Sequence, residues 1–299
     1  MMRSVGGRES NAATTLGVAV AAPASEDAIS VVESWQGLAG VRERPDDFRV
    51  GVVAWPPDLP TSAGAHLVVG VGHAASVEGE HEAVDVWTDI ATAHELWRER
   101  VLPFHDNLAA NRRAPRRRVA ELTPPDATWP AQARRLIARL ERVLGDAALR
   151  IDHIGSTSVR ALAAKDLIDI QVVVADLQTA DATAEHARDA GFVRVPGRWT
   201  GPDRYGTQFD EVVLVDADPG RPVNVNLRSV GDPVWRETLL FRDWLVADAA
   251  KRDRYLAFKR RLAETTENVD EYSSGKLPWI RDALEAASRW AQEVGWQPA

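Results

Sequence analysis

The stretch DHIGSTS at residues 152–158, followed by KDLIDIQVVV at residues 165–174, decides how the rest of the chain is read. Residues 149–154 alternate between apolar and polar side chains, which is typical of a strand with one buried face. Residues 167–174 are almost continuously apolar and β-branched, as in a central strand covered on both faces. The sequence therefore predicts a strand, a tight turn, a short link and an inner strand.

The residues of this turn suit an anionic ligand. Gly155 lets the backbone approach a ligand closely, and the hydroxyl residues at 156–158 can hold anionic oxygens. Lys165 would supply a positive charge for a phosphate, and Asp169 a carboxylate for a metal ion. The alternative is an ordinary loop with a locally paired Asp169, and these residues alone leave both interpretations open.

This stretch resembles the GrpB family of the nucleotidyltransferase superfamily, whose domains have a DNA polymerase β-like fold. The family hallmark is the run His153 to Ser158, then Ala164-Lys165, then a strand reading Ile168-Asp169-Ile170. The resemblance extends from about residue 119 to the C-terminus. It implies an α+β domain over residues 116–299, with a mixed sheet and flanking helices, that binds a nucleotide or another phosphorylated small molecule.

The chain departs from the superfamily pattern where a metal would bind. Superfamily enzymes carry two carboxylates one residue apart on the inner strand and a third on a later strand. Here Asp169 matches the first, but Gln171 stands at the second position, and the later strand at 223–229 contains no acid. Mg²⁺ at Asp169 is the cofactor that the resemblance implies, while the two replacements argue against two-metal nucleotidyl transfer. Any phosphoryl transfer would depend on Asp169 and Lys165.

Other candidate ligand contacts follow from the later segments. Asn226 and Arg228 share one face of the predicted strand 223–229, because side chains alternate along a strand; a sheet face in contact with water is the alternative. Arg204 lies in a predicted loop that commonly gives a basic side chain in this family, with a surface arginine as the alternative. The candidate phosphate-binding residues are His153, Gly155, Ser156, Thr157, Ser158, Arg204, Asn226, Arg228 and Lys276.

Two tyrosine–lysine pairs also match a family pattern, namely Tyr255 with Lys259 and Tyr272 with Lys276. Lys276 opens a predicted helix, where its charge opposes the helix dipole. We therefore expect a ligand or an acidic partner beside Lys276.

Composition limits the class of protein. A net charge of −8 argues against nucleic acid as a partner, although the basic run at residues 111–118 leaves phosphate contact open as an alternative to solvated surface. The absence of cysteine excludes disulfides and thiolate sites, and it favours a cytoplasmic protein. The apolar run at 16–22 is too short to span a bilayer, so we expect no membrane partner; a poor signal peptide is the alternative.

The first part of the chain is divided into two segments. Residues 1–44 are expected to be mostly disordered apart from a helix at 27–38, and residues 45–115 are predicted as an α/β remnant ending in a basic linker. Residues 83–115, with LWRERVLPF at 96–104, resemble the tail of actinobacterial dephospho-CoA kinases, in which a GrpB-like domain often follows the kinase. No phosphate loop of the form GxxxxGK(S/T) occurs in the chain, which argues against kinase activity in coenzyme A biosynthesis. An accessory or folding module for a dephospho-CoA kinase is the alternative function.

The remaining elements are predicted from periodicity. Strands are expected at 50–55, 66–71, 84–89, 119–122, 192–195, 209–215 and 223–229. Helices are expected at 92–107 with an interruption at Pro103, and at 129–144, 177–190, 233–246, 252–263 and 276–294. Residues 198–208 are predicted as a loop.

Overall fold

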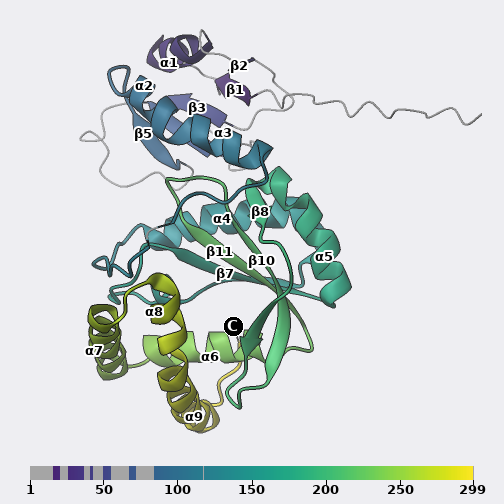
Figure 1. Ribbon diagram of the computed structural model, residues 1–299, viewed down its shortest axis with the longest axis vertical. Helices are drawn as coiled ribbons and strands as arrows, with labels where there is room; N and C mark the ends of the chain where they lie inside the picture. The colour runs from purple at the N-terminus through teal and green to yellow at the C-terminus, as the bar shows by residue number, and fades with distance from the viewer. Residues whose placement is uncertain are drawn as a thin grey trace, which may run out of the picture.

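The computed structural model describes residues 16–20, 26–36, 41–42, 50–54, 67–71, 84–116 and 118–298. Two sheets organise them, one near the top and one in the middle of Figure 1, with four C-terminal helices at the bottom. We call residues 16–109 the N-terminal unit and residues 118–298 the C-terminal domain. No helix within the described ranges is both long and apolar enough to cross a membrane.

The N-terminal unit is built on a parallel sheet with the strand order β2-β1-β3-β4-β5. Its elements are β1 (Leu16–Val20), α1 (Glu26–Gln36), β2 (Val41–Arg42), β3 (Val50–Ala54), β4 (Leu67–Val71), β5 (Val86–Thr88), α2 (Ala93–Leu96), a π-helix (Trp97–Val101) and α3 (Leu102–Ala109). The predicted interruption of the last helix at Pro103 corresponds to the change from π-helix to α3, where proline needs no N–H donor.

Within residues 1–44, expected to be mostly disordered, the structure describes a strand that was not predicted from the sequence. The apolar run at 16–20, considered above only as a membrane or export signal, is a strand paired on both sides, with β2 and β3. The helix predicted at 27–38 is present as α1, and residues 1–15 lie outside the described residues. A five-residue apolar run is long enough for an inner parallel strand, which explains this difference.

The C-terminal domain has a mixed sheet with the order β6-β7-β11-β10-β8, and β9 pairs with β10 beside this path. Strands β7 and β11 are parallel and the other neighbours are antiparallel. The strands are β6 (Arg150–Ile154), β7 (Ile168–Val174), β8 (Phe192–Arg194), β9 (Trp199–Pro202), β10 (Gln208–Asp216) and β11 (Val223–Ser229). The helices are α4 (Trp129–Leu144), α5 (Leu177–His186), α6 (Val234–Val246), α7 (Ala249–Thr265), α8 (Val269–Gly275) and α9 (Leu277–Val294). The predicted α+β class, with a mixed sheet and flanking helices, is confirmed.

Two local predictions are wrong, and one helix was not predicted. Residues 119–122 form no strand: Val119 is 59% exposed, and an isolated bridge at Thr123 lies just beyond the segment. The segment 198–208, predicted as a loop, contains β9. Helix α8 was not predicted, and it begins where the side chain of Asn268 accepts hydrogen bonds from two backbone N–H groups of the first turn.

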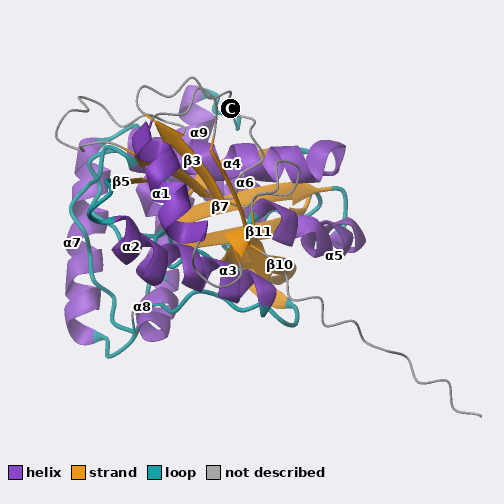
Figure 2. Ribbon diagram, turned by 90° about the horizontal axis from the view of Figure 1, so that it is seen from above, coloured by secondary structure: helices purple, strands orange, loops and turns teal. Residues whose placement is uncertain are grey.

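The sheet of the C-terminal domain has two different faces. One face packs on α4 and α5 through side chains such as Ile170, Leu214 and Phe192. On the other face, the register places Val213 opposite Asn226 and Val215 opposite Asn224, so these side chains point to the same side. The β8–β10 part of this second face is apolar and packs on the N-terminal unit. Figure 2, seen from above, shows helices of that unit in front of these strands.

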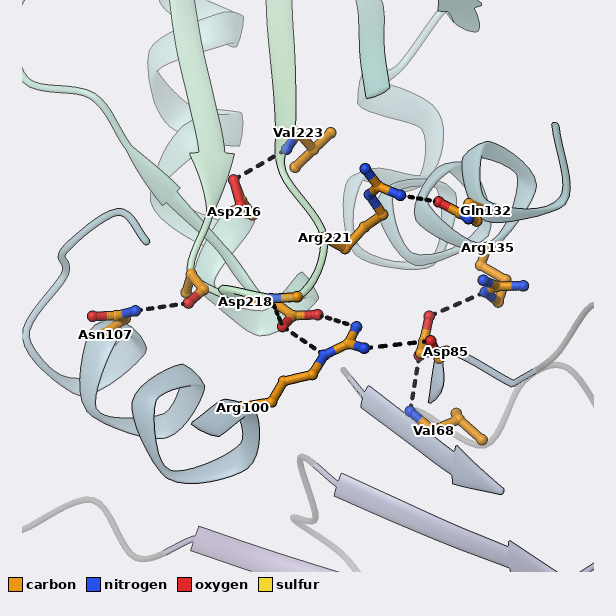
Figure 3. A network of polar contacts seen from close by, with 12 residues as sticks. Val68, Asp85, Arg100, Asn107, Gln132, Arg135, Asp216, Asp218, Arg221 and Val223 are labelled. Carbon is orange, nitrogen blue, oxygen red and sulfur yellow. Dashed lines mark hydrogen bonds and ion pairs between the residues drawn. The ribbon is translucent and has the colours of Figure 1, made fainter. Parts of the chain in front are cut away.

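Ion pairs reinforce the contact between the N-terminal unit and the C-terminal domain (Figure 3). The guanidinium of Arg100 donates two hydrogen bonds to the carboxylate of Asp218, at 2.9 and 2.7 Å. Asp85 accepts hydrogen bonds from Arg135 at 3.1 Å and from Arg139 at 2.5 Å, both on α4. Asn107 donates to the backbone carbonyl of residue 217 at 2.9 Å. The described residues 84–109 are therefore packed onto the C-terminal domain by buried, directional contacts.

Candidate functional site

The turn after β6 and the carboxylate on β7 face each other. Gly155 has φ = 72°, in the left-handed region that favours glycine, and it leads into a 3-10 turn over Ser156–Ser158. A Cβ atom added at Gly155 would overlap Oδ2 of Asp169 and lie 3.0 Å from its Cβ. The glycine corner and Asp169 thus lie in contact, on the same side of the sheet.

A cavity of about 340 Å³ opens beside this corner. Polar side chains lie on its sheet side. Helices α6 and α9 form the other wall, where apolar side chains lie beside Glu237, Thr238 and Arg242. The predicted site residues that line the cavity are Gly155, Ser156, Asp169, Asn226, Arg228 and Lys276. Six of the predicted site residues are therefore brought together around one hollow.

Asp169 lies among positive charges. Its Oδ1 accepts a hydrogen bond from Asn224 Nδ2 at 3.2 Å, and Asn224 in turn accepts one from Arg116. Burial raises the pKa of Asp169 above its usual value. The opposing, weaker effects come from Lys276, the amide of Asn224, Lys165 and Arg116. Three cations therefore act on one carboxylate that burial makes harder to ionise.

Lys276 joins α8 to α9 at the rim of the cavity. Its Nζ lies 5.1 Å from the centre of the Tyr272 ring. Burial, assisted by repulsion from Lys165, lowers the pKa of Lys276 to about 8, while Asp169 acts in the opposite direction. The acidic neighbour expected from the unfavourable helix position is thus Asp169.

Lys259 is a site residue that the candidate set above omits. Its side chain is 1% exposed, and its Nζ donates to Ser156 Oγ at 3.2 Å and to the carbonyl of Ala163 at 2.6 Å. The ring of Tyr255 lies 4.9 Å from the same nitrogen. Burial, and then Lys276, lower the pKa of Lys259 to about 7. The tyrosine–lysine pattern noted in the sequence is the signal that could have identified it.

The charged form of Lys259 determines how Ser156 can bind a ligand. An ammonium group has three donors and no acceptor, so Ser156 Oγ accepts the hydrogen bond from Lys259. The Ser156 hydroxyl also forms a hydrogen bond with the Tyr255 side chain, and Ser156 lines the cavity. An anionic oxygen placed in the cavity would compete with the Tyr255 oxygen for the Ser156 proton.

Three predicted ligand residues stabilise the turn instead. Thr157 Oγ1 donates to the carbonyl of Leu167 at 3.3 Å and lies 3.0 Å from Nε2 of His153. Ser158 Oγ donates to the carbonyl of Gly155 at 2.6 Å. Burial, and then Arg242, lower the pKa of His153 to about 4, so its imidazole is neutral at pH 7. Among the described residues, the lining of the cavity does not include these three side chains.

The predicted arginines are already paired with carboxylates. Arg204 donates to Glu237 at 2.5 Å and to the hydroxyl of Ser288, and it is outside the described lining of the cavity. Arg228 lines the cavity but forms ion pairs with Glu211 at 2.5 Å and Asp232 at 3.4 Å. Arg204 therefore lies behind Glu237, a residue of the cavity lining, and the charge of Arg228 is largely compensated.

Lys165 lies outside the cavity lining but within electrostatic range of Asp169. Its Nζ donates to Ser273 Oγ at 3.4 Å and is 5.4 Å from the centre of the Tyr272 ring. Burial lowers the pKa of Lys165, while Asp169 opposes this effect. Lys165 therefore adds positive charge without a direct contact to the hollow.

The donor set does not fit a magnesium ion. Gln171, at the second carboxylate position, donates to Asp152 Oδ2 and to the carbonyl of Trp235, both at 3.2 Å. In the part of the chain that the structure describes, no group of three or more His, Cys, Asp or Glu side chains is placed to hold a metal. The cations around Asp169 would repel a divalent ion, which prefers several oxygen ligands.

Comparison with known proteins identifies relatives of this chain. The family profile described as "GrpB protein" matches residues 119–286. A UPF0157 protein of Halalkalibacterium halodurans is 34% identical over 180 residues, which are 57% of this chain and 88% of that protein. The dephospho-CoA kinase of Mycolicibacterium paratuberculosis is 39% identical over 250 residues, 75% of this chain and 61% of the kinase. The chain therefore spans about 61% of the length of this kinase relative. The crystal structure of a conserved protein GrpB from Enterococcus faecalis has a TM-score of 0.47 and 24% identity, covering 57% of this chain and 99% of that one.

Proposed function

The chain belongs to the GrpB family, and we propose that its cavity binds a nucleotide or another phosphorylated small molecule without a metal ion. The observation that carries this proposal is the excess of positive charge around Asp169. Lys276, Lys165 and Arg116 all act on that carboxylate, and Lys259 lies behind Ser156. Asp216 also attracts Arg116, and Asp270, exposed on α8, attracts Arg116 and Lys165. The carboxylate that acts on the pKa of Lys276 is Asp169, whereas burial and Lys276 act on the pKa of Lys259. A phosphate group would supply the missing negative charge.

Five of the six predicted site residues that line the cavity have a role in this binding, because the charge of Arg228 is already paired. Lys276 supplies the charge, and Ser156 donates its hydroxyl proton to a phosphate oxygen. Gly155 leaves room for the Asp169 carboxylate, which lies where a Cβ at this corner would be. Asn226 adds an amide donor. Asp169 can donate a hydrogen bond to phosphate in its protonated form, which burial favours.

We propose binding and not nucleotidyl transfer. Transfer by two metal ions needs carboxylates that hold both ions. Gln171 and the asparagines of β11 stand where such carboxylates would be, and Gln171 is already bonded to Asp152. The chemistry of the site therefore supports recognition of an anion more directly than its turnover.

The experiment is a thermal-unfolding titration of the full chain with pyrophosphate, AMP and ATP, in EDTA and again with Mg²⁺. A ligand at one hundred times its dissociation constant should stabilise the protein by about 2.7 kcal/mol. We expect stabilisation in EDTA that is lost in Lys276→Gln and kept in Lys251→Gln, whose lysine lies over Trp244 and Trp290 outside the cavity lining. Stabilisation only with Mg²⁺, or by none of the three ligands, would overturn the proposal.

A second candidate function is an accessory module for a dephospho-CoA kinase. It is favoured by the relatives named dephospho-CoA kinase, whose alignments with this chain cover 75% of its residues. Affinity purification of this chain with a separately encoded dephospho-CoA kinase tests it, and a chain that stays unbound at micromolar concentrations contradicts it. Kinase activity of the chain itself is not proposed, because the sequence has no phosphate loop.

A further inference from the structure

We infer that the ligand of the cavity is amphipathic, with its phosphate at Lys276 and an apolar chain lying against the wall that α6 and α9 form. This inference rests on the proposed function and names the class of molecule that the site takes. The two helices pack against each other and enclose the side of the cavity opposite the sheet.

The apolar wall begins directly at the cation. Leu277, Ile280 and Leu284 follow Lys276 along α9 and all line the cavity. Their spacing of three and four residues places them on one face of the helix. At 1.5 Å per residue, the stripe from 276 to 284 is about 12 Å long. A ligand held at Lys276 can therefore extend along apolar surface for about two turns.

Helix α6 supplies the opposite side of this apolar wall. Phe241 and Leu245 line the cavity one turn apart, and Leu245 is 1% exposed. Val159, which follows the glycine corner, is also 1% exposed and lines the same space. A ligand chain in this position would contact aliphatic and aromatic carbon on several sides.

The polar side chains on this wall are engaged with the protein. Glu237 accepts hydrogen bonds from the backbone N–H and the side chain of Arg204. Arg242 donates to Asp243 at 2.7 Å and to the carbonyl of His153 at 3.2 Å. The hydroxyl of Thr238 donates to a backbone carbonyl of its own helix at 2.8 Å. A nucleobase needs partners for its polar edge, whereas an alkyl chain needs none, so this wall favours the alkyl chain.

The test is isothermal titration calorimetry of the full chain with ethyl, butyl and hexyl phosphate, inorganic phosphate, AMP and hexanol. Affinity should rise about fourfold for each added methylene. Ile280→Ser should abolish the dependence on chain length and leave the affinity for inorganic phosphate unchanged. Val294→Ser, on the same helix but 56% exposed and outside the cavity lining, is the matched control. Leu277→Ser is a second variant at a more exposed position of the wall, used if circular dichroism shows that Ile280→Ser is unfolded.

The outcomes separate the two proposals. Alkyl phosphates that bind with equal affinity at every chain length, beside tight AMP binding, overturn the amphipathic ligand and leave phosphate recognition intact. Hexanol binding as tightly as hexyl phosphate overturns the placement of the phosphate at Lys276. Failure of every phosphate compound in this titration, together with no stabilisation by pyrophosphate or ATP in thermal unfolding, overturns the proposed function itself.

Discussion

One face of the sheet in the C-terminal domain packs on the N-terminal unit along some strands and lines a cavity along others. On β8 and β10, Val193, Val213 and Val215 face the N-terminal unit and are packed into its apolar core. On β7 and β11, Asp169 and Asn226 share that face but line a cavity under the C-terminal helices. Toward this one face, β8 and β10 present apolar side chains, whereas β7 and β11 present polar and charged side chains.

The two regions also differ in how their buried charges are paired. In the packed region the guanidinium of Arg100 and the carboxylate of Asp218 form a bidentate pair. In the cavity region the cations outnumber the carboxylate on which they act. Paired charge indicates a structural contact, and an excess of one sign in a hollow indicates a ligand.

The largest effect is expected in the packed region. Asp218→Ala leaves the guanidinium of Arg100 buried without its carboxylate and removes the acceptor of the Gly220 N–H. Loss of one partner of a buried pair costs about 3–5 kcal/mol, and urea unfolding measures this loss. Glu99→Ala is the control, because the pair of Arg98 with Glu99 is exposed and should contribute less than about 1 kcal/mol. If Asp218→Ala and Glu99→Ala lowered the free energy of unfolding equally, the pair of Arg100 with Asp218 would not stabilise the contact between the N-terminal unit and the C-terminal domain.

The pH dependence of stability should reveal Asp216, at the end of β10. Burial raises its pKa to about 7, although its carboxylate accepts a hydrogen bond from the Val223 N–H at 3.1 Å (Figure 3). The folded state then binds this proton more tightly than the unfolded state, so stability falls as the pH rises from about 4 to about 7. The contribution is at most ~4 kcal/mol. Asp216→Asn should flatten the slope in chemical unfolding measured across this range, and an unchanged slope would count against the assignment.

The glycine corner should be sensitive to a single methyl group. Gly155→Ala places a Cβ on the Asp169 carboxylate at a positive φ, which should cost roughly 1–3 kcal/mol and abolish phosphate binding. Gly197→Ala is a matched control, because Gly197 has φ = 87° and open space around the added Cβ. The control should lose about 1 kcal/mol of stability and bind ligand normally. Equal ligand binding by both variants would show that the corner is not part of the site.

The smallest expected effect is at Lys259. Lys259→Met removes the donor to Ser156 Oγ, so the serine hydroxyl is free to turn away from the cavity. We expect the affinity for pyrophosphate to fall about tenfold, which corresponds to the ~1.4 kcal/mol expected for one hydrogen bond. Calorimetry compares it with Lys251→Met, a lysine outside the cavity lining. If Lys259→Met bound pyrophosphate with unchanged affinity, Lys259 would contribute only to the packing of the protein.

Local patterns in the sequence predicted much of the fold. The helix at 129–144 and the strands at 168–174 and 223–229 follow from apolar periodicity, which depends only on neighbours in the chain. The contact of Gly155 with Asp169 was also within reach, because consecutive strands β6 and β7 pair directly. Strand β9 and helix α8 were missed, since each depends on partners that a local pattern does not show.

The site was harder to predict because its contacts are distant in sequence. The hydrogen bond from Lys259 to Ser156 joins residues 103 positions apart. Arg204 was assigned to the cleft by resemblance, but Glu237, 33 positions away, binds it instead. Thr157 and Ser158 have the hydroxyls that a ligand needs, yet these bond to the backbone of their own turn region. Residue type alone could not distinguish a ligand contact from a turn contact.

Crystals of the full chain soaked in tungstate, a strongly scattering tetrahedral anion, provide the most direct measurement. The predicted result is an anomalous peak inside the cavity, within hydrogen-bond distance of Ser156 Oγ and Lys276 Nζ, in crystals kept in EDTA. A cavity without a peak, while tungstate occupies other basic surfaces, would contradict the claim that this half of the sheet face holds a phosphate group.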